Sequence, residues 1–466
     1  MKAERIHSGA GHDSEAMRSR ALEHLWMHSA GWAQMAEAGE PLIMVEADGA
    51  RVTDSRGRRW IDVNGGYASV NAGYGREELA RAAYDQARRI HFFPQRTTCP
   101  PTVNLAAKLA AITPGDLSRS FLVSGGSEAN ETALKIVRAA QRRRGERGRY
   151  RIVSRRGSYH GGSLGVLWLG APEDGALDEY GPRPPGLLYA PQPHFYRCAF
   201  GSQSAEQCAA RCVEATEKLI LENGPETVAA LIAEPIPITP RAGAAVPHDS
   251  YWPMLREVCD RHGVLLVADE VVTGFGRTGR MFGIEHWGVV PDVMTVAKGL
   301  SSTCMPLGAT IVRKDIADLF ATEDTLLRHV FTAAGHPVAA AVGLKNLEII
   351  EREKLVENAA GVGAYFKQRL EALTGRHAII GDVRGLGLLL AVEIVADRKT
   401  KAPFPPERRI ADELEAAFRK RGLLLRAGGG LIMPTPPLCV TRDDIDEIVD
   451  AMDEALSEVA LNQANK

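Results

Sequence analysis

Two residues at the ends of apolar runs could hold an aldehyde-bearing cofactor. Lys298 follows the run Val293 to Ala297, and it lies 29 residues after Asp269, which ends the run that begins at Gly263. Apolar surroundings disfavour the charged form of a lysine, and a neutral amine can form a Schiff base with an aldehyde. A carboxylate nearby suits a pyridinium nitrogen, so the two residues together suggest pyridoxal 5′-phosphate (PLP).

Three more apolar runs end on residues that could contact the same cofactor. In open α/β sheets, ligands bind outside the carboxyl ends of the strands, so features at these ends should meet in one site. A glycine-rich turn that begins a helix offers free amides and the positive end of the helix dipole to an anion such as a phosphate. The three runs, at 120–123, 150–153 and 228–233, are followed by Gly126 and Ser127, by Tyr159, and by Glu234.

Each of these features has an ordinary alternative when it is considered alone. A Gly-Gly-Ser turn can be only a helix N-cap, an isolated aromatic such as Tyr159 is more often packed in a core, and a lone lysine is usually at the surface. Asp269 and Glu270 could also be a pair of metal ligands or a helix cap. Glu128 and Glu131 would repel a phosphate unless their carboxylates turn away from it. The five strand ends together favour one cofactor site.

The pattern along the chain indicates the elements that hold these residues. Between about 75 and 330, helical patterns alternate with short apolar strands, which argues for an α/β layer with a mainly parallel sheet. The segment before this layer reads as a helix and then a pair of strands, with turn signals at Asp48-Gly49 and at Ser55 to Gly57. The segment after it reads as a long helix from Pro337, strands within 381–393, a helix at 409–421, a strand at 423–425 and a closing helix from Thr441.

The length of 466 residues is sufficient for two domains. We expect residues 1–75 to be an N-terminal segment of a small domain, residues 76–335 to be a large cofactor-binding domain, and residues 336–466 to complete the small domain. Two proline-rich stretches, 181–194 and 402–406, are expected to be loops.

The composition argues against several classes of protein. With 56 basic and 58 acidic residues, a net charge of −2, the chain does not favour nucleic acid or an anionic membrane as a partner. No apolar run is long enough to cross a membrane, and Met1 to His7 lacks the apolar region of a signal peptide. Cys208 and Cys212 have no second pair of ligands, so the seven cysteines favour free thiols over a zinc site. We expect a cytoplasmic protein without a metal.

The chain resembles the class III aminotransferases, the fold type I group of PLP-dependent enzymes that includes the ω-amino acid and amine transaminases. The similarity extends over about residues 40–455. Its most specific stretch is Leu265 to Gly279, followed at the expected distance by Ala297 to Leu300. Four further motifs occur in the family order, at 124–130, 158–161, 233–235 and 331–337.

The resemblance implies a fold and a set of roles. The fold would be α/β of fold type I, in which a large domain has a mainly parallel seven-stranded sheet flanked by helices and the N- and C-terminal segments form a smaller α/β domain. Lys298 would hold PLP and move the reacting proton, and Asp269 would keep the pyridine nitrogen protonated. The other implied contacts are Gly126 and Ser127 on the phosphate, Tyr159 and Val271 on the two ring faces, Glu234 beside the ring or substrate, and Thr332 on the phosphate of the neighbouring subunit. The last contact implies a homodimer, or a tetramer that contains it.

Several positions depart from the family pattern. Some branches have glutamine where this chain has Val272, which points towards the amine and ω-amino acid branch. The loop at 237–243 is altered, and Ala68 stands where related amine transaminases can carry a bulky aromatic, which would leave room for a larger substrate unless another side chain fills it. Arg426, followed by glycines at 428–430, lies where related ω-transaminases place a mobile arginine that binds carboxylates. Alternatively, Arg426 is a surface residue at a strand end.

The leading hypothesis is amino transfer in two half-reactions, from a small amine or ω-amino acid to an oxo acid. Pyruvate is favoured over 2-oxoglutarate as acceptor by resemblance alone, and the donor remains open among ω-amino acids, polyamines, chiral amines and amino sugars. A mutase, an epimerase or a dialkylglycine-type decarboxylase would share Lys298 and Asp269. A non-catalytic PLP-binding regulator is a more distant alternative, and the chain lacks the G-x-G-x-x-G pattern of a hydride-transfer enzyme.

Overall fold

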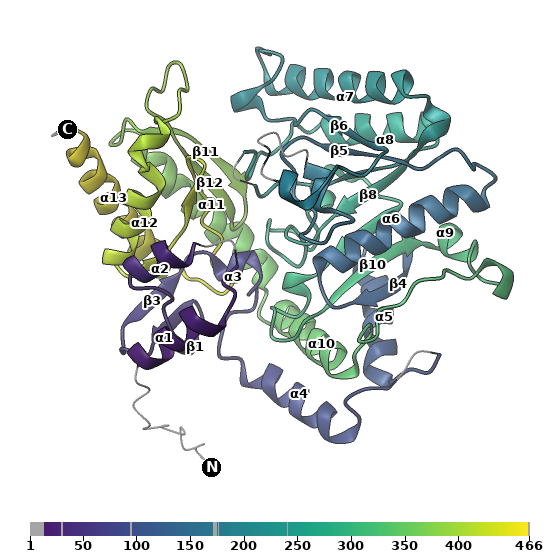
Figure 1. The fold of residues 1–466 in the computed structure, drawn as a ribbon, viewed down its shortest axis with the longest axis horizontal. Helices are drawn as coiled ribbons and strands as arrows, with labels where there is room; N and C mark the ends of the chain where they lie inside the picture. The colour runs from purple at the N-terminus through teal and green to yellow at the C-terminus, as the bar shows by residue number, and fades with distance from the viewer. Residues whose placement is uncertain are drawn as a thin grey trace.

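The computed structural model of the protein describes residues 14–28, 31–93, 96–170, 175, 177–239 and 241–464, so Met1 to His7 lies outside the described residues. In Figure 1, the first and last segments of the chain (purple and yellow) lie together on one side of the molecule, and the middle of the chain forms the larger part on the other side.

A seven-stranded sheet forms the centre of the larger part and confirms the predicted α/β class. Its strands lie in the order β4-β10-β9-β8-β7-β5-β6. The five strands β9, β8, β7, β5 and β6 are parallel to one another, whereas β10 is antiparallel to both β4 and β9. The strand bounds are Leu117–Val123 (β4), Arg151–Arg155 (β5), Leu187–Ala190 (β6), Val228–Ala233 (β7), Leu265–Asp269 (β8), Val293–Val296 (β9) and Gly308–Arg313 (β10).

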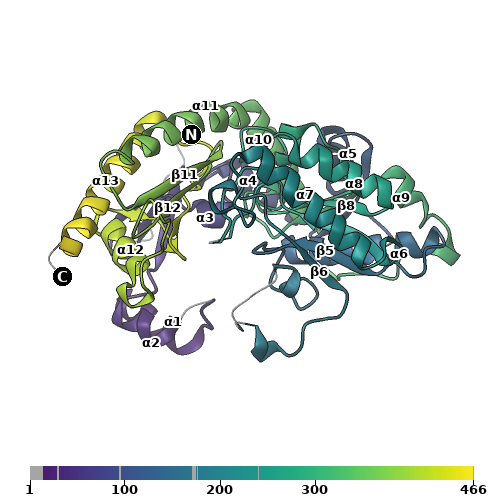
Figure 2. The same ribbon diagram turned by 90° about the horizontal axis from the view of Figure 1, so that it is seen from above.

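Both faces of this sheet are buried, which is why its strands are continuous apolar runs. In β8, Leu265 and Val267 belong to one hydrophobic cluster and Leu266, between them, belongs to the other. Successive side chains of a strand point to opposite faces, so each face needs its own helical layer. Helix α6 (Gly126–Arg143) packs across one face, and α5 (Pro100–Ile112), α7 (Ala205–Glu222) and α8 (Tyr251–His262) cover the other. Figure 2 shows α7 and α8 lying over β5, β6 and β8.

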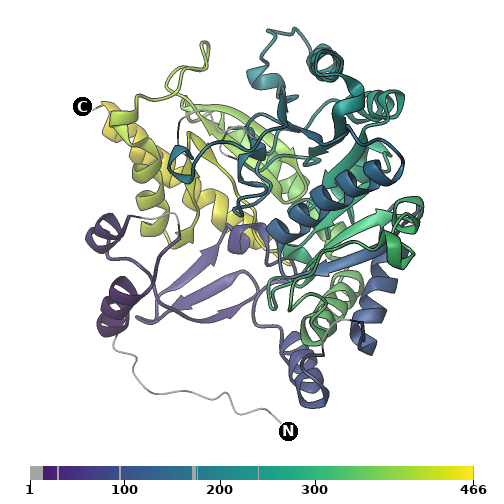
Figure 3. The same ribbon diagram turned by 45° about the vertical axis from the view of Figure 1, so that its right-hand side comes forward.

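Two four-stranded sheets form the smaller part and join the two ends of the chain. In the first, β13 of the C-terminal segment lies parallel to β3 of the N-terminal segment, with Leu423 opposite Ile61. The second is antiparallel and belongs to the C-terminal segment alone. Figure 3 shows the purple strands beside the yellow helices. The bounds are Met44–Asp48 (β1), Arg51–Asp54 (β2), Arg59–Asp62 (β3), Ile380–Leu386 (β11), Leu389–Ile394 (β12), Leu423–Leu424 (β13), Ala427–Gly428 (β14) and Leu431–Ile432 (β15).

The remaining helices test the other sequence predictions. The long helix from Pro337 is confirmed as α10 and the closing helix as α13, but the helix α11 was not predicted. The expectation of a loop throughout 181–194 is wrong, because Leu187–Ala190 (β6) pairs with β5 at the edge of the large sheet and so needs only one neighbour. The bounds are Ser14–His24 (α1), Trp32–Glu37 (α2), Gly65–Ala68 (α3), Glu77–Arg89 (α4), Lys314–Asp318 (α9), Pro337–Arg352 (α10), Leu355–Leu373 (α11), Ile410–Lys420 (α12) and Arg442–Ala464 (α13).

Within the described parts of the chain, none of these helices combines the length and the apolar composition that a bilayer span requires.

Candidate active site

Lys298 lies two residues past the end of β9 and lines a cavity together with residues at the carboxyl ends of neighbouring strands. It begins the short turn Lys298–Leu300 and has a left-handed backbone with φ of 40°. Residues other than glycine rarely adopt such angles unless the surrounding structure fixes them, and they often do so at functional sites. Burial lowers the pKa of Lys298 to about 8, although the charge of Asp269 opposes this effect. At pH 7 such a pKa leaves about one tenth of the amine unprotonated and nucleophilic, far more than for a lysine with the ordinary pKa near 10.5.

The cavity that contains the Lys298 amine has a volume of about 150 Å³. Seven of the eight residues predicted to contact the cofactor line this cavity, although they come from widely separated parts of the sequence. They are Gly126, Ser127, Tyr159, Glu234, Asp269, Val271 and Lys298. The eighth, Thr332, is exposed on the segment before α10 and does not line it.

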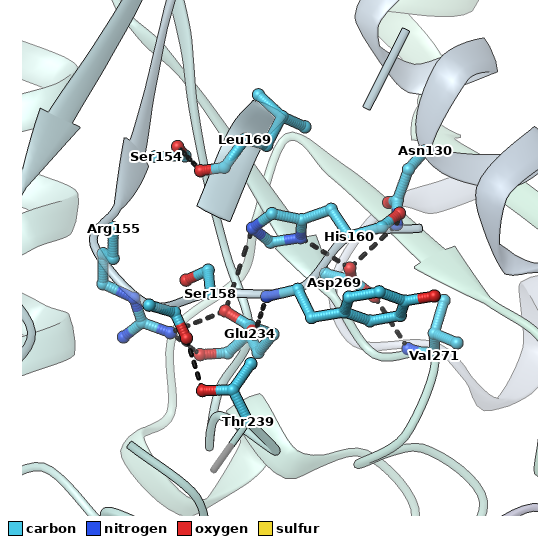
Figure 4. Close-up of polar contacts among 12 residues, drawn as sticks. Asn130, Ser154, Arg155, Ser158, His160, Leu169, Glu234, Thr239, Asp269 and Val271 are labelled. Atoms are coloured by element: carbon cyan, nitrogen blue, oxygen red, sulfur yellow. Dashed lines mark hydrogen bonds and ion pairs between the residues drawn. The ribbon is translucent and has the colours of Figure 1, made fainter. Parts of the chain in front are cut away.

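Asp269, at the end of β8, is held by three donors. Its Oδ2 accepts a hydrogen bond from Asn130 Nδ2 at 2.8 Å and lies 2.7 Å from His160 Nδ1, while its Oδ1 accepts one from Val271 N at 3.0 Å (Figure 4). Thr295, on the neighbouring strand, donates to Asn130 Oδ1 at 2.7 Å and so fixes the orientation of the amide. The carboxylate therefore has a fixed position on the wall of the cavity, as pairing with a ring nitrogen requires.

His160 connects Asp269 to a second buried carboxylate, Glu234. His160 Nε2 lies 3.8 Å from Glu234 Oε2, and Arg155 donates to the same oxygen at 3.3 Å (Figure 4). Burial opposes the protonated form of His160, but the charges of Glu234 and Asp269 outweigh it and raise the pKa of this histidine. Burial likewise acts to raise the pKa of Glu234, but the charges of His160 and Arg155 lower it overall. Positive and negative groups thus alternate from Arg155 to Asp269.

The N-terminus of α6 contributes Gly126 and Ser127 to the wall of the cavity. Its N-cap is Gly125, no side chain caps it, and the helix has 18 residues. A Cβ on Gly126 would lie 2.9 Å from Val271 Cγ1, so glycine keeps the backbone amides accessible here. Ser127 Oγ accepts a hydrogen bond from Gly162 N at 3.1 Å, which links the start of α6 to the loop that follows Tyr159.

Two acidic residues lie near the start of α6, Glu128 in its first turn and Glu131 further along, and neither lines the cavity. Glu128 Oε2 accepts a hydrogen bond from Ser124 N at 2.8 Å, and Glu131 Oε1 accepts one from Gly165 N at 3.2 Å. Both carboxylates are therefore occupied by backbone amides. The helix dipole remains available to a phosphate.

A second, larger pocket of about 500 Å³ shares Lys298 and Tyr159 with the first. Ala68 and Arg426, the predicted substrate contacts, both line this pocket. Most of its wall is apolar, and the other lining residues are Asn64, Tyr67, Ile238, Leu389, Ala427, Gly428, Leu431, Met433 and Thr435. Lys298 thus lines both the smaller cavity and the larger pocket.

Among the residues that line these two cavities, the sequence analysis assigned no role to Asn130, His160 or Tyr67, and it also missed Arg155, which lines neither cavity but contacts Glu234. Asn130 and His160 hold Asp269, Arg155 holds Glu234, and Tyr67 lines the substrate pocket. His160 directly follows Tyr159 in the motif at 158–161, and Asn130 ends the motif at 124–130, so their positions in those motifs were the available signal. No local pattern marks Arg155 or Tyr67, because their partners lie far away in the sequence.

The residues in the smaller cavity fit PLP. A buried amine can take the aldehyde carbon, a fixed carboxylate can pair with the pyridine nitrogen, and a helix N-terminus without a side-chain cap can take the phosphate. Two carboxylates, Asp269 and Glu234, line the cavity, and Glu234 is already hydrogen-bonded to Arg155 and to the backbone of Tyr159.

Comparisons with known proteins agree with this fit. Residues 34–456 match the family model described as Aminotransferase class-III. The chain is 37% identical over 433 residues to the putrescine–pyruvate aminotransferase of Pseudomonas aeruginosa, covering 92% of this chain and 93% of that protein.

Two solved structures are similar over almost the whole chain. One is an (S)-enantioselective ω-transaminase from Thermomicrobium roseum, with a TM-score of 0.91 and 41% identity over 96% of this chain and 99% of that one. The other is a PLP-bound amine transaminase from an uncultivated Pseudomonas species, with a TM-score of 0.88 and 36% identity over 94% of this chain and 98% of that one. The chain therefore belongs to the class III aminotransferases, and it is an enzyme that transfers amino groups with PLP as its cofactor.

Proposed function

We propose that this enzyme moves an amino group from a small amine or ω-amino acid to pyruvate in two half-reactions. The observation that carries the proposal is the position of Lys298 between the cofactor cavity and an apolar pocket with a guanidinium, that of Arg426, on its wall. An apolar pocket suits the body of an amine, and a guanidinium suits the carboxylate of an oxo acid. The name of the Pseudomonas aeruginosa relative, which uses putrescine and pyruvate, also supports an amine donor and this acceptor.

Lys298 is the proposed catalytic residue. When bound, PLP supplies an aldehyde that accepts the amino group and a ring that accepts electrons. Lys298 Nζ would hold the cofactor until the substrate amine replaces it. The freed Nζ would then take the proton from the substrate carbon that bears the amino group and deliver it to the former aldehyde carbon of the cofactor. A pKa of about 8 suits this role, because the amine can both accept and release a proton near neutral pH.

The other cofactor residues are proposed to bind and orient. Asp269 holds the proton on the pyridine nitrogen, and Gly126 and Ser127 bind the phosphate through the α6 N-terminus. Tyr159 and Val271 enclose the ring from opposite sides, which excludes water from the reacting face. Glu234 fixes the backbone of Tyr159, since its Oε1 accepts a hydrogen bond from Tyr159 N at 3.0 Å.

We propose a homodimer as the active unit, with Thr332 completing the phosphate site of the neighbouring subunit. The exposure of Thr332 and its absence from the wall of its own cavity support a contact across subunits rather than within one. Residues 1–75 and 336–466 are proposed to form a small domain, and 76–335 the PLP-binding domain, a division supported by the pairing of β3 with β13. All seven cysteines are free thiols, which supports a cytoplasmic location.

Ala68 and Arg426 are proposed to set the substrate range. The methyl group of Ala68 leaves part of the pocket wall unfilled, which suits a donor with a bulky apolar body. Arg426 binds the carboxylate of the oxo acid or of an ω-amino acid. Arg426→Ala should slow the half-reaction with pyruvate far more than the half-reaction with a simple monoamine.

Single half-reactions test the proposed function directly. The PLP form of the enzyme is mixed with 1-phenylethylamine, putrescine or β-alanine, and the cofactor absorbance is followed in a stopped-flow instrument. The converted enzyme is then mixed with pyruvate or 2-oxoglutarate. We expect conversion by at least one amine and recovery by pyruvate. Release of carbon dioxide, or racemised donor without oxo product, would instead favour the decarboxylase or epimerase.

A further inference from the structure

Arg426 is already engaged by a neighbouring phenol. Its Nη1 donates a hydrogen bond to Tyr67 Oη at 2.7 Å, and its Cζ lies 5.3 Å from the centroid of the Tyr67 ring. Both side chains line the substrate pocket and are exposed. The guanidinium therefore has a defined position on the pocket wall, where it is hydrogen-bonded to the Tyr67 hydroxyl.

The backbone that presents Tyr67 has an uncommon conformation. Gly65, Gly66, Tyr67 and Ala68 all have positive φ, between 53° and 63°, so the chain makes one left-handed helical turn. Left-handed angles are unfavourable for residues with a Cβ, so this turn needs other interactions to hold it.

Asp62 and Thr435 provide those interactions. Asp62 Oδ2 accepts hydrogen bonds from Gly66 N and from the hydroxyl of Tyr74, both at 2.8 Å. A Cβ on Gly65 would lie 2.3 Å from the carbonyl oxygen of Thr435, so the turn is pressed against the C-terminal segment. These contacts hold the backbone of Tyr67 in place, and its side chain lines the pocket.

The backbone of Arg426 is tied to the same turn. Arg426 N donates to Asn64 Oδ1 at 3.1 Å, and Ala427 N donates to Glu415 Oε1 at 2.9 Å. Motion of the whole segment would break these bonds. The long side chain of Arg426 can instead rotate while its backbone stays in place.

We propose that Tyr67 is a specificity-determining residue that holds Arg426 on the pocket wall while an uncharged amine occupies the pocket and releases it to a carboxylate. This proposal rests on the proposed role of Arg426 in carboxylate binding. A phenol offers one neutral acceptor and an aromatic face, so it is a weaker partner for guanidinium than a carboxylate, which can accept two charge-assisted bonds. It nevertheless prevents the guanidinium from being left unpaired beside an apolar substrate.

Tyr67→Phe tests this proposal, because it removes the hydroxyl and keeps the ring and the backbone angles. Steady-state constants are measured with 1-phenylethylamine as donor and pyruvate as acceptor. Loss of one hydrogen bond should raise KM for the amine and lower KM for pyruvate, each by about threefold to tenfold. Opposite changes are the signature of a shifted Arg426, whereas general damage to the pocket would raise both constants. Two constants that move together, or neither moving, would overturn the proposal.

Tyr84→Phe is the matched control, because Tyr84 is an exposed tyrosine on α4 outside both cavities. It should leave both constants unchanged.

Arg426→Ala separates this proposal from the function on which it rests. In an Arg426→Ala background, Tyr67→Phe should no longer shift the two constants in opposite directions, because the partner is gone. If Arg426→Ala impairs the pyruvate half-reaction while Tyr67→Phe alone has no effect, the role of Tyr67 is overturned and the role of Arg426 stands. If Arg426→Ala leaves the pyruvate half-reaction intact, both are overturned.

Discussion

His160 Nδ1 lies 2.7 Å from Asp269 Oδ2, and both side chains are buried. Asp269 thus lines the cofactor cavity while its carboxylate is bound to His160, and His160 in turn lies near Glu234. A hydrogen bond to a charged group is worth about 1.5–3 kcal/mol. We therefore predict that His160→Asn lowers kcat about 10- to 100-fold, measured in the half-reaction with an amine. A variant with wild-type kcat would show that His160 does not support Asp269.

The raised pKa of His160 predicts a pH-dependent stability. A base with a raised pKa in the folded state stabilises the fold fully below its unfolded value of 6.5, and this contribution is lost as the pH rises through the folded pKa. The Tm of the wild type should therefore fall above pH 6.5 more steeply than that of His160→Asn. Parallel Tm curves from pH 6 to pH 9 would contradict the charged state of His160.

Asp269→Asn should separate cofactor binding from turnover. The amide can keep hydrogen bonds near the site, but it has no charge to keep a pyridine nitrogen protonated. Removing a preorganised electrostatic partner of this kind costs about 2.7–4 kcal/mol of transition-state stabilisation, or 10²- to 10³-fold in kcat. Spectroscopic titration should still find bound PLP. Near-wild-type kcat in the variant would show that Asp269 is not the nitrogen partner.

Gly161→Ala should weaken PLP binding through Ser127. Gly161 has φ of 135°, and a Cβ at this position would lie 2.5 Å from Ser127 Oγ. Overpacking of this kind costs about 1–3 kcal/mol, so the Kd for PLP should rise roughly tenfold to 100-fold in equilibrium dialysis. Gly145→Ala is a control at another positive φ with open space around it. Equal Kd values for PLP in the two variants would show that Ser127 does not bind the phosphate.

The proposed contact of Thr332 across subunits can be tested with hybrid dimers. Lys298→Ala and Thr332→Ala subunits are each expected to be impaired. If Thr332 serves the neighbouring subunit, a hybrid of the two has one fully native site, and mixing should recover up to about half of the wild-type activity per hybrid dimer. If Thr332 acts within its own chain, mixing produces no native site and no recovery. An active monomer in sedimentation would also contradict the dimer.

The sequence predicted the parts of the site that depend on short segments. Lys298, Asp269 and Gly126 each follow an apolar strand, and a parallel sheet brings such strand ends to one edge. The sequence could not predict Tyr67 beside Arg426, because that contact needs a left-handed turn and the pairing of β3 with β13 over more than 350 residues. Arg155 was missed for the same reason, since its partner Glu234 directly follows another strand, β7.

The helix α11 and the strand β6 show a second limit. The chain between Leu355 and Leu373 contains two glycines, at 361 and 363, which weaken a helical pattern. Gly363 is nevertheless required, because a Cβ there would lie 2.2 Å from the carbonyl oxygen of Gly387. In α11, packing against Gly387 thus outweighs the low helix propensity of glycine. In β6, pairing with β5 outweighs the loop signal of the neighbouring prolines.

Covalent attachment of PLP to Lys298 is the most direct test of the account. The PLP form is reduced with borohydride at several pH values, digested and mapped by mass spectrometry. Because burial lowers the pKa of Lys298 to about 8, the rate at which the apoenzyme captures PLP should rise through pH 8 rather than through the usual range near 10.5. In the wild type we predict the pyridoxyl mass on the peptide that contains Lys298 and on no other. In Lys298→Ala we predict no pyridoxyl mass on the corresponding peptide. The same mass on another lysine of the wild type would contradict the assignment of the active site.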